Sequence, residues 1–175
     1  MSSIANVPEV INNFNAYSNG TQLIGVTASV ALPNFDAITE EISGAGVMGS
    51  YETSIPGFYS SMEQEVGFRT LDSDIFELMN PTSAVDLTFR ASAQSTVKAT
   101  GALTYNGMRI VERGRFKSFE PGTLEVGKQM ESKLKFECLY FLCEIDGETM
   151  LEYDKLNSVF IVNGVDLLEK VRSLT

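Results

Sequence analysis

Residues 85–93 read VDLTFRASA. Apolar side chains occupy every second position of this stretch, and Asp86, Thr88, Arg90 and Ser92 occupy the positions between them. Because successive side chains of a strand point to opposite faces, this alternation predicts a strand with one buried and one solvated face. The stretch favours a β protein, and related patterns extend from it in both directions.

Strand-like stretches and tight turns follow one another along most of the chain. Asn-Gly and Asp-Gly pairs are typical of two-residue hairpin turns; they occur at residues 19–20, 106–107, 146–147 and 163–164. We expect the 106–107 pair to join a strand over 97–105 to one over 108–119. Further strands are expected over residues 12–17, 23–32, 62–69, 132–145, 149–153 and 156–162. The sequence therefore predicts a mainly β fold, an antiparallel β-sandwich or partly open barrel.

Two short helices and a terminal arm complete the predicted fold. Asp72 or Ser73 can cap a short central helix that ends at Asn80-Pro81, and residues 165–172 have the pattern of a short amphipathic C-terminal helix. Residues 1–10 are expected to be a flexible arm. A chain of 175 residues is expected to form a single domain.

Residues 34–57 are expected to form a long extended loop, because they combine scattered apolar residues with many glycines. They contain GAGVMG at 44–49, which matches the G-x-G-x-x-G pattern of nucleotide-binding loops. Such a loop needs a buried strand before it and a helix after it, and the flanking residues favour neither. We therefore expect either a flexible turn or a loop that docks on another subunit. The candidate docking contacts are Phe35, Ile38, Ile42, Val47 and Met48.

The composition argues against an enzyme and against nucleic-acid recognition. Thirteen basic and 23 acidic residues give a net charge of −10, which repels phosphates and disfavours sequence-specific nucleic-acid binding. The chain has no histidine and so lacks the usual general base and the commonest metal ligand. Cys138 and Cys143 have no metal-ligand spacing, so we expect free thiols. We predict no catalytic residue, cofactor or metal, and the absence of a leader-like N-terminus favours folding in a cytoplasm.

Two charged groups lie on predicted strand faces. Glu63 and Glu65 share one face, where carboxylates are usually solvated but can also line a water-filled channel. On the strand 108–119, even spacing places four basic residues on one face: Arg109, Arg113, Arg115 and Lys117. A nucleic-acid patch usually adds stacking aromatic rings, and the nearby phenylalanines do not share this face cleanly. We expect this basic face to contact acidic surface, on the same subunit or on a neighbour.

Several segments occur in a particular order and spacing. They are Ala31-Leu32-Pro33, Gly44-Ala45-Gly46 to Gly49-Ser50, Arg113-Gly114-Arg115, Glu131-Ser132-Lys133 through Tyr140-Phe141, Asp146-Gly147 and Asn163-Gly164-Val165-Asp166. In this order the chain resembles the major tail tube proteins of contractile-tailed phages, a family that also serves phage-tail-like bacteriocins. The resemblance spans about residues 13–172 and is strongest in the C-terminal half.

The resemblance implies the tail-tube fold and a structural role. It implies hexameric rings whose sheets join into one inner barrel, and rings that stack into a hollow tube for DNA passage or membrane puncture. The implied partners are further copies of the chain, a sheath protein outside, a tape-measure protein inside, and baseplate and tail terminator proteins. The implied location is a virion tail or phage-tail-like particle assembled in the bacterial cytoplasm. A lumen that conducts DNA should repel phosphates, and our candidates for lumen-facing acids are Glu63, Glu65 and Asp86.

Two other functions stay open from the sequence. The first is the tube-forming ring of a type VI secretion system, which uses a similar tube and differs in its neighbouring genes. The second is a small β-barrel that binds an apolar ligand. The sequence offers no convergent polar pocket for such a ligand, so the structural role is our leading hypothesis.

Overall fold

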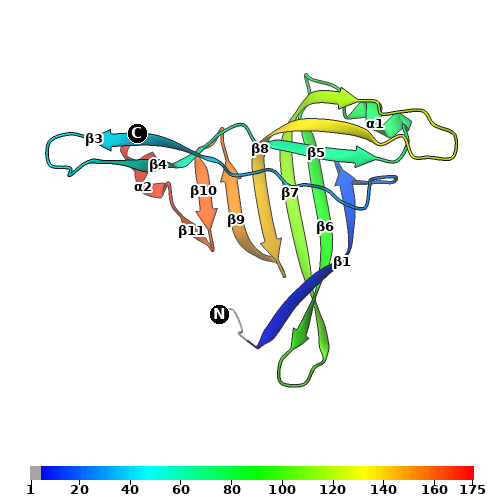
Figure 1. Cartoon of the computed structure of the whole chain (residues 1–175), viewed down its shortest axis with the longest axis horizontal. Helices are drawn as coiled ribbons and strands as arrows, with labels where there is room; N and C mark the ends of the chain where they lie inside the picture. The colour runs from blue at the N-terminus through cyan, green and yellow to red at the C-terminus, as the bar shows by residue number, and fades with distance from the viewer. Residues whose placement is uncertain (1–4) are drawn as a thin grey trace.

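The computed structural model describes residues 5–175 and is mainly β (Figure 1). The strands are β1 (Asn6–Ser18), β2 (Thr21–Leu23), β3 (Ala37–Ser43), β4 (Ser50–Tyr59), β5 (Glu63–Phe68), β6 (Val85–Val97), β7 (Leu103–Glu120), β8 (Ser132–Ile145), β9 (Glu148–Asp154), β10 (Val159–Val162) and β11 (Val165–Asp166). The helices in this part of the chain are α1 (Ser73–Glu77) and α2 (Glu169–Leu174). No helix among the described residues is long and apolar enough to cross a membrane.

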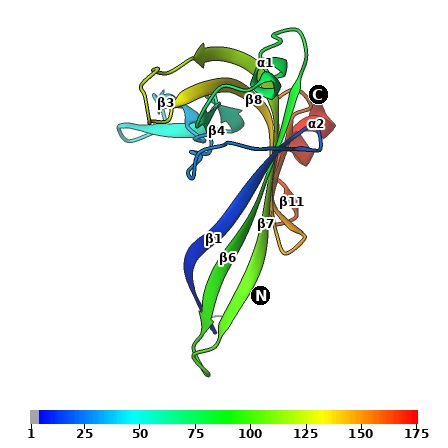
Figure 2. The ribbon, with the colours of Figure 1, turned by 90° about the vertical axis from the view of Figure 1, so that its right-hand side faces the viewer.

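Most strands belong to one antiparallel sheet with the order β11-β10-β9-β8-β7-β6-β1-β2, which β5 joins by pairing with β8. The long strand β8 changes neighbours along one edge, because its first half pairs with β5 and its second half with β9. The end of β7 and the start of β8 bend over the rest of the sheet (Figure 2). One sheet thereby supplies two layers, and the predicted fold class, a mainly β, partly open sandwich, is confirmed.

Irregularities in the β7–β8 ladder accompany this bend. The register shifts between Arg113 and Gly114, and again between Phe116 and Ser118. Extra residues at such bulges bend a strand and increase its local twist. At position 114 a Cβ atom would lie 2.0 Å from the backbone oxygen of Glu137, so only glycine allows the two strands to approach this closely.

The core lies between the bent layers. Met62, Phe68, Leu134 and Phe136 are among the largest fully buried side chains, and all four come from β5, β8 or the residue that precedes β5. Burial of a large apolar side chain stabilises a fold by about 1.5–3 kcal/mol, so this region carries much of the stability of the chain.

The strand predicted over residues 23–32 is wrong beyond its first residue. β2 ends at Leu23, and within the remainder only Val26 forms a bridge, with Phe68. The chain leaves β1 at this point and crosses to β5, where the N–H of Thr27 donates to the carbonyl of Gly67 at 2.9 Å.

The hairpin predicted at Asn106-Gly107 is also wrong. β6 runs on, and the chain reverses over residues 98–102, where Gly101 has a φ of +70°. Asn106 and Gly107 lie inside β7 instead. The side-chain amide of Asn106 and the N–H of Gly107 both donate to the carboxylate of Asp146, which belongs to the turn between β8 and β9. These contacts with the neighbouring turn hold the pair in an extended strand.

The flexible arm predicted over residues 1–10 is wrong for residues 6–10, which belong to β1 and pair with β6. Residues 1–4 lie outside the described part of the chain. Both predicted helices are present. Asp72 caps α1, because its carboxylate accepts a hydrogen bond from the N–H of Ser73 at 2.6 Å, whereas α2 begins only at Glu169.

Candidate assembly surfaces

The segment predicted as a long loop is a β-hairpin that stands apart from the main sheet. Within the described residues, β3 and β4 pair only with each other, and Figure 1 shows them projecting past the β11 end of the sheet. The chain reverses at residues 44–49, where all three glycines of GAGVMG have positive φ. The G-x-G-x-x-G pattern is thus explained as a turn. The prediction of an extended loop over residues 34–57 is corrected to a hairpin.

Aromatic packing fixes the base of this hairpin. Tyr59, the last residue of β4, packs edge to face against Phe35, Tyr153 and Phe160, with ring centroids 5.2–5.6 Å apart. The hydroxyl of Tyr153 also donates to the carbonyl of Gly57 at 3.0 Å. Phe35 therefore packs within its own chain at the base, which corrects its assignment to the tip of a docking loop.

The rest of the hairpin is exposed on both faces. No residue of β3 or β4 is buried. Ile38 is exposed, Ile42 and Val47 are half-buried, and Met48 at the turn is fully exposed. A two-stranded hairpin is at best marginally stable alone in water, and exposed apolar side chains mark contact surfaces when they cluster. These four residues stay candidates for contacts with another subunit.

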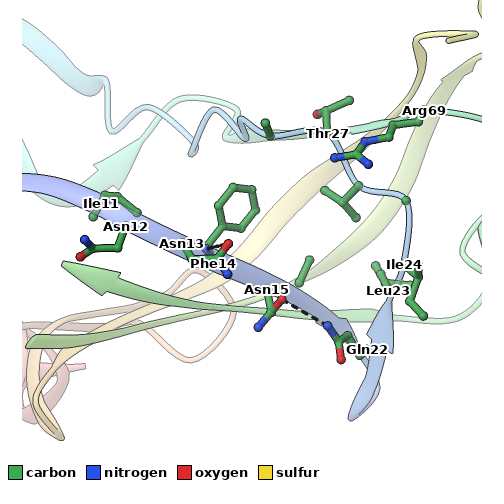
Figure 3. A pocket seen from close by; sticks show the side chains of 14 residues that line it. Ile11, Asn12, Asn13, Phe14, Asn15, Gln22, Leu23, Ile24, Thr27 and Arg69 are labelled. Atoms are coloured by element: carbon green, nitrogen blue, oxygen red, sulfur yellow. Dashed lines mark hydrogen bonds between the residues drawn. The ribbon is translucent and has the colours of Figure 1, made fainter. Parts of the chain in front are cut away.

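A cleft of about 500 Å³ lies at the opposite end of the sheet (Figure 3). One wall is β1, whose residues 6–15 pair with β6 on one edge and with no described strand on the other. The other wall is the segment 22–28, and the guanidinium of Arg69 points into the space between the walls. Ile11 and Ile24 expose apolar surface at its border. An unpaired strand edge is a surface to which another chain can add.

The predicted lumen acids of β5 lie among lysines of β7 and β8. Glu63 pairs with Lys117 at 2.8 Å, Glu65 pairs with Lys133 at 3.1 Å, and Lys135 lies 3.7 Å from each glutamate. The hydrogen bond from Lys117 lowers the pKa of the Glu63 carboxyl, and the same bond raises the pKa of the Lys117 ammonium. The charges of these two acids are therefore compensated within their own chain.

The predicted basic face of β7 is exposed as expected, and most of it is paired. Arg109 lies 2.8 Å from Glu144, and Arg113 lies 3.1 Å from Asp86, the third candidate lumen acid. Arg115 has no ion-pair partner among the described residues. The sequence left open whether this face contacts acidic surface on the same subunit or on a neighbour. Most of the observed contacts are with acids of the same subunit.

A buried carboxyl on β7 was not predicted from the sequence. The side chain of Glu112 is 2% exposed, and neither of its carboxylate oxygens has a hydrogen-bond partner in the described part of the chain. Its Cα partners Leu87 and Phe141 are core residues, and burial raises the pKa of Glu112 to about 8. A signal was available, because the spacing that turns Arg113 outward turns the adjacent Glu112 inward.

Residues 5–175 contain no group of three or more side chains that could hold a metal ion. A family model described as phage tail tube protein FII matches residues 8–174. The chain belongs to this family.

Two relatives extend the match over nearly the whole chain. The tail tube protein of Escherichia phage P2 is 35% identical over 170 residues, which cover 95% of this chain and 96% of the relative. The major tail tube protein of Serratia phage KSP20 is 25% identical over 161 residues, which cover 92% and 91%. The resemblance predicted from the sequence is confirmed.

Membership of the tail tube family decides the class of function. Tail tube proteins are structural components of a phage tail, so this tail tube protein is not an enzyme, as predicted. It self-assembles into a tube within the tail.

Proposed function

We propose that this tail tube protein forms closed rings of six subunits, which stack into the inner tube of a contractile tail. The observation that carries the proposal is the hairpin β3–β4, which pairs only with itself, is anchored at its base and exposes apolar side chains beyond it. It projects at one end of the sheet, and the unpaired edge of β1 lies at the other. The β11 edge and the β1 edge of the sheet are also two different surfaces, and a repeated contact between two different surfaces closes into a ring when its rotation permits.

The hairpin is the proposed stacking element. The seven residues of β3 span about 20 Å, at about 3.3 Å per residue, and the hairpin projects past the sheet, where it can contact a subunit of the next ring. Its contacts are Ile38, Ile42, Val47 and Met48. Burying these side chains against a second subunit removes apolar surface from water and orders a hairpin that is marginally stable alone.

The sheets of neighbouring subunits join at their edges into one inner barrel, which removes the exposed edge of β1 over residues 6–10, outside the cleft. The lumen of this barrel passes DNA or, in a phage-tail-like particle, serves membrane puncture. A net charge of −10 suits a lumen that must not bind phosphates. Glu63, Glu65 and Asp86 are the proposed lumen acids, although the cations beside them reduce their field.

The proposed partners follow from a tube of this kind. A sheath protein surrounds the tube, a tape-measure protein occupies its lumen, and baseplate and tail terminator proteins bind its ends. Assembly takes place in the bacterial cytoplasm. On the basic face of β7, Arg115 is the proposed contact for acidic surface of a neighbour, because Arg109, Arg113 and Lys117 pair within their own chain.

Electron microscopy of the purified, concentrated protein tests this proposal. We expect hollow tubes of uniform width with six subunits in each turn or ring. Deletion of residues 38–50 should leave a folded subunit that forms monomers or rings but no long tubes. A melting temperature close to that of the full chain is the control, because the deleted residues are not part of the core. Long tubes from the deletion variant would contradict the stacking role, and a strict monomer, even with a matching baseplate, would contradict tube formation.

A further inference from the structure

The hairpin carries negative charge that its own chain does not compensate. Glu41 and Glu52 are direct cross-strand partners in the β3–β4 ladder, and Glu40 lies beside them. Like charges placed directly opposite each other destabilise a strand pair. The first 68 residues contain neither Lys nor Arg, and none of these three acids has an ion pair within the described residues. A cation from another molecule would remove the repulsion.

Arg69 has the complementary character. It is exposed and has no ion-pair partner among the described residues. Its backbone is fixed, because its N–H donates to the carbonyl of Gly25 at 2.9 Å and its carbonyl accepts from the N–H of Met130 at 2.7 Å. Its guanidinium points into the cleft between β1 and the segment 22–28 (Figure 3). A planar guanidinium presents several donors at once and can bind two carboxylates.

The other arginines without an ion pair fit this role less well. Arg90 lies over the ring of Tyr17, with its guanidinium carbon 5.6 Å from the ring centroid. Arg115 borders a groove that already contains the carboxylate of Asp154. The groove at Arg69 has no acidic lining residue and has Ile11 and Ile24 exposed at its border.

The two surfaces lie at opposite ends of the molecule. The hairpin projects beyond the β11 end of the sheet, and the Arg69 cleft lies at the β1–β2 end. The hairpin is held at its base by Tyr59, so it cannot fold back across the sheet to reach its own cleft. Contact between them therefore requires two copies of the chain.

We propose that the Arg69 cleft of one subunit is the receptor for the β3–β4 hairpin of a second copy. The guanidinium of Arg69 binds Glu41 and Glu52, and the apolar residues of the hairpin turn pack against the exposed border of the cleft. This inference rests on the proposed tube assembly and names the surface on which its stacking element docks. It also makes assembly sensitive to salt, because the attraction between exposed charges is screened.

Charge reversal in the full chain tests the pairing. Arg69→Glu should raise the protein concentration at which tubes form by at least about tenfold at low salt, because it places like charges across the contact. Lys170→Glu in α2 is the matched control, since it reverses another exposed cation that has no ion pair among the described residues, and should leave this concentration unchanged. Both variants should keep the melting temperature of the wild type. The triple variant Arg69→Glu with Glu41→Lys and Glu52→Lys restores opposite charges and should restore tubes.

The possible results distinguish the receptor proposal from the proposed tube assembly. Tubes from Arg69→Glu at the wild-type concentration, or equal losses from Arg69→Glu and Lys170→Glu, would overturn the receptor assignment and leave the tube function intact. Failure of the triple variant to form tubes would overturn the pairing of Arg69 with the two glutamates. A wild-type protein that forms no tubes would overturn the proposed function, and the receptor with it.

Discussion

The β5–β8 pair and the β3–β4 pair are both short antiparallel ladders, but their surroundings differ. Alternate residues of β5 are buried against the bent half of the main sheet, including Gln64, Val66 and Phe68. No residue of β3 or β4 is buried. Backbone pairing alone is a weak source of stability. The first ladder is therefore stabilised by its own chain, whereas the second has no such support within one subunit, and we propose that contact with another subunit completes it.

Substitution of the buried phenylalanine of β8 should have the largest effect on the isolated subunit. Phe136→Ala leaves a cavity between the bent layers and should lower the free energy of unfolding by about 3–5 kcal/mol. Met48→Ala in the hairpin turn is the matched substitution and should leave this free energy unchanged, because Met48 is fully exposed. Urea denaturation of the monomer measures both. A similar loss for the two variants would show that the hairpin contributes to the stability of the monomer.

The buried carboxyl of Glu112 should make the free energy of unfolding depend on pH. Its pKa is raised to about 8 in the folded state, so the folded state retains a proton that the unfolded state loses. The contribution of Glu112 to the free energy of unfolding is fully present below the pKa that this carboxyl has in the unfolded state. This contribution decreases as pH rises and is lost above about pH 8. We expect the free energy of unfolding to fall by about 2–3 kcal/mol between pH 5 and pH 7 from this group alone.

Substitution with the neutral isostere tests this expectation. Glu112→Gln should flatten the pH dependence between pH 5 and pH 8, as measured by thermal unfolding at a series of pH values. Glu148→Gln, at an exposed position of β9, is the control and should leave the dependence unchanged. An unchanged slope in Glu112→Gln would contradict the assignment of the pH dependence to this carboxyl.

The sequence predicted the elements whose pattern arises from their own burial. The alternation over residues 85–93 became the core strand β6, and residues 132–145 became β8. The hairpin over residues 37–59 was missed because neither of its faces is buried in one subunit, so it has no alternation to detect. The inward position of Glu112 follows from the spacing on β7, but a charged residue is rarely expected in a core.

The turn at Asn106-Gly107 was mispredicted for a different reason. Turn propensity is local, whereas the carboxylate that engages this pair is supplied by Asp146, 40 residues later in the chain. The pairing among the candidate site residues was missed for a similar reason. The sequence predicted the lumen acids and the basic face as two unrelated groups. Only the fold shows that Lys117 pairs with Glu63 and that Arg113 pairs with Asp86.

Removal of the hydrogen bond between Asn106 and Asp146 should have a moderate effect on stability. Asn106→Ala loses its hydrogen bond to Asp146 and should lower the melting temperature by about 2–4 °C at neutral pH. The hydrogen bonds from Asn106 and Gly107 lower the pKa of Asp146 in the folded state. Their contribution to stability is therefore present above the pKa of Asp146 in the unfolded state, and it is lost as pH falls through the pKa in the folded state. The difference between variant and wild type should therefore shrink in acid. A difference that persists in acid would contradict a role for the Asp146 carboxylate.

The smallest effect is expected where charges are compensated more than once, and it sharpens the contrast with the hairpin. Lys117→Met removes one cation beside Glu63 and Glu137, yet Lys135 still lies 3.7 Å from Glu63 and Lys155 lies 3.8 Å from Glu137. Exposed ion pairs contribute little and are screened by salt, so we expect a change in melting temperature of about 1 °C or less. Tube formation should also be unchanged, because these acids need no cation from a second subunit. A loss of tubes in Lys117→Met comparable to that in Arg69→Glu would show that the compensated face of β5 and β8 is itself part of the subunit contact.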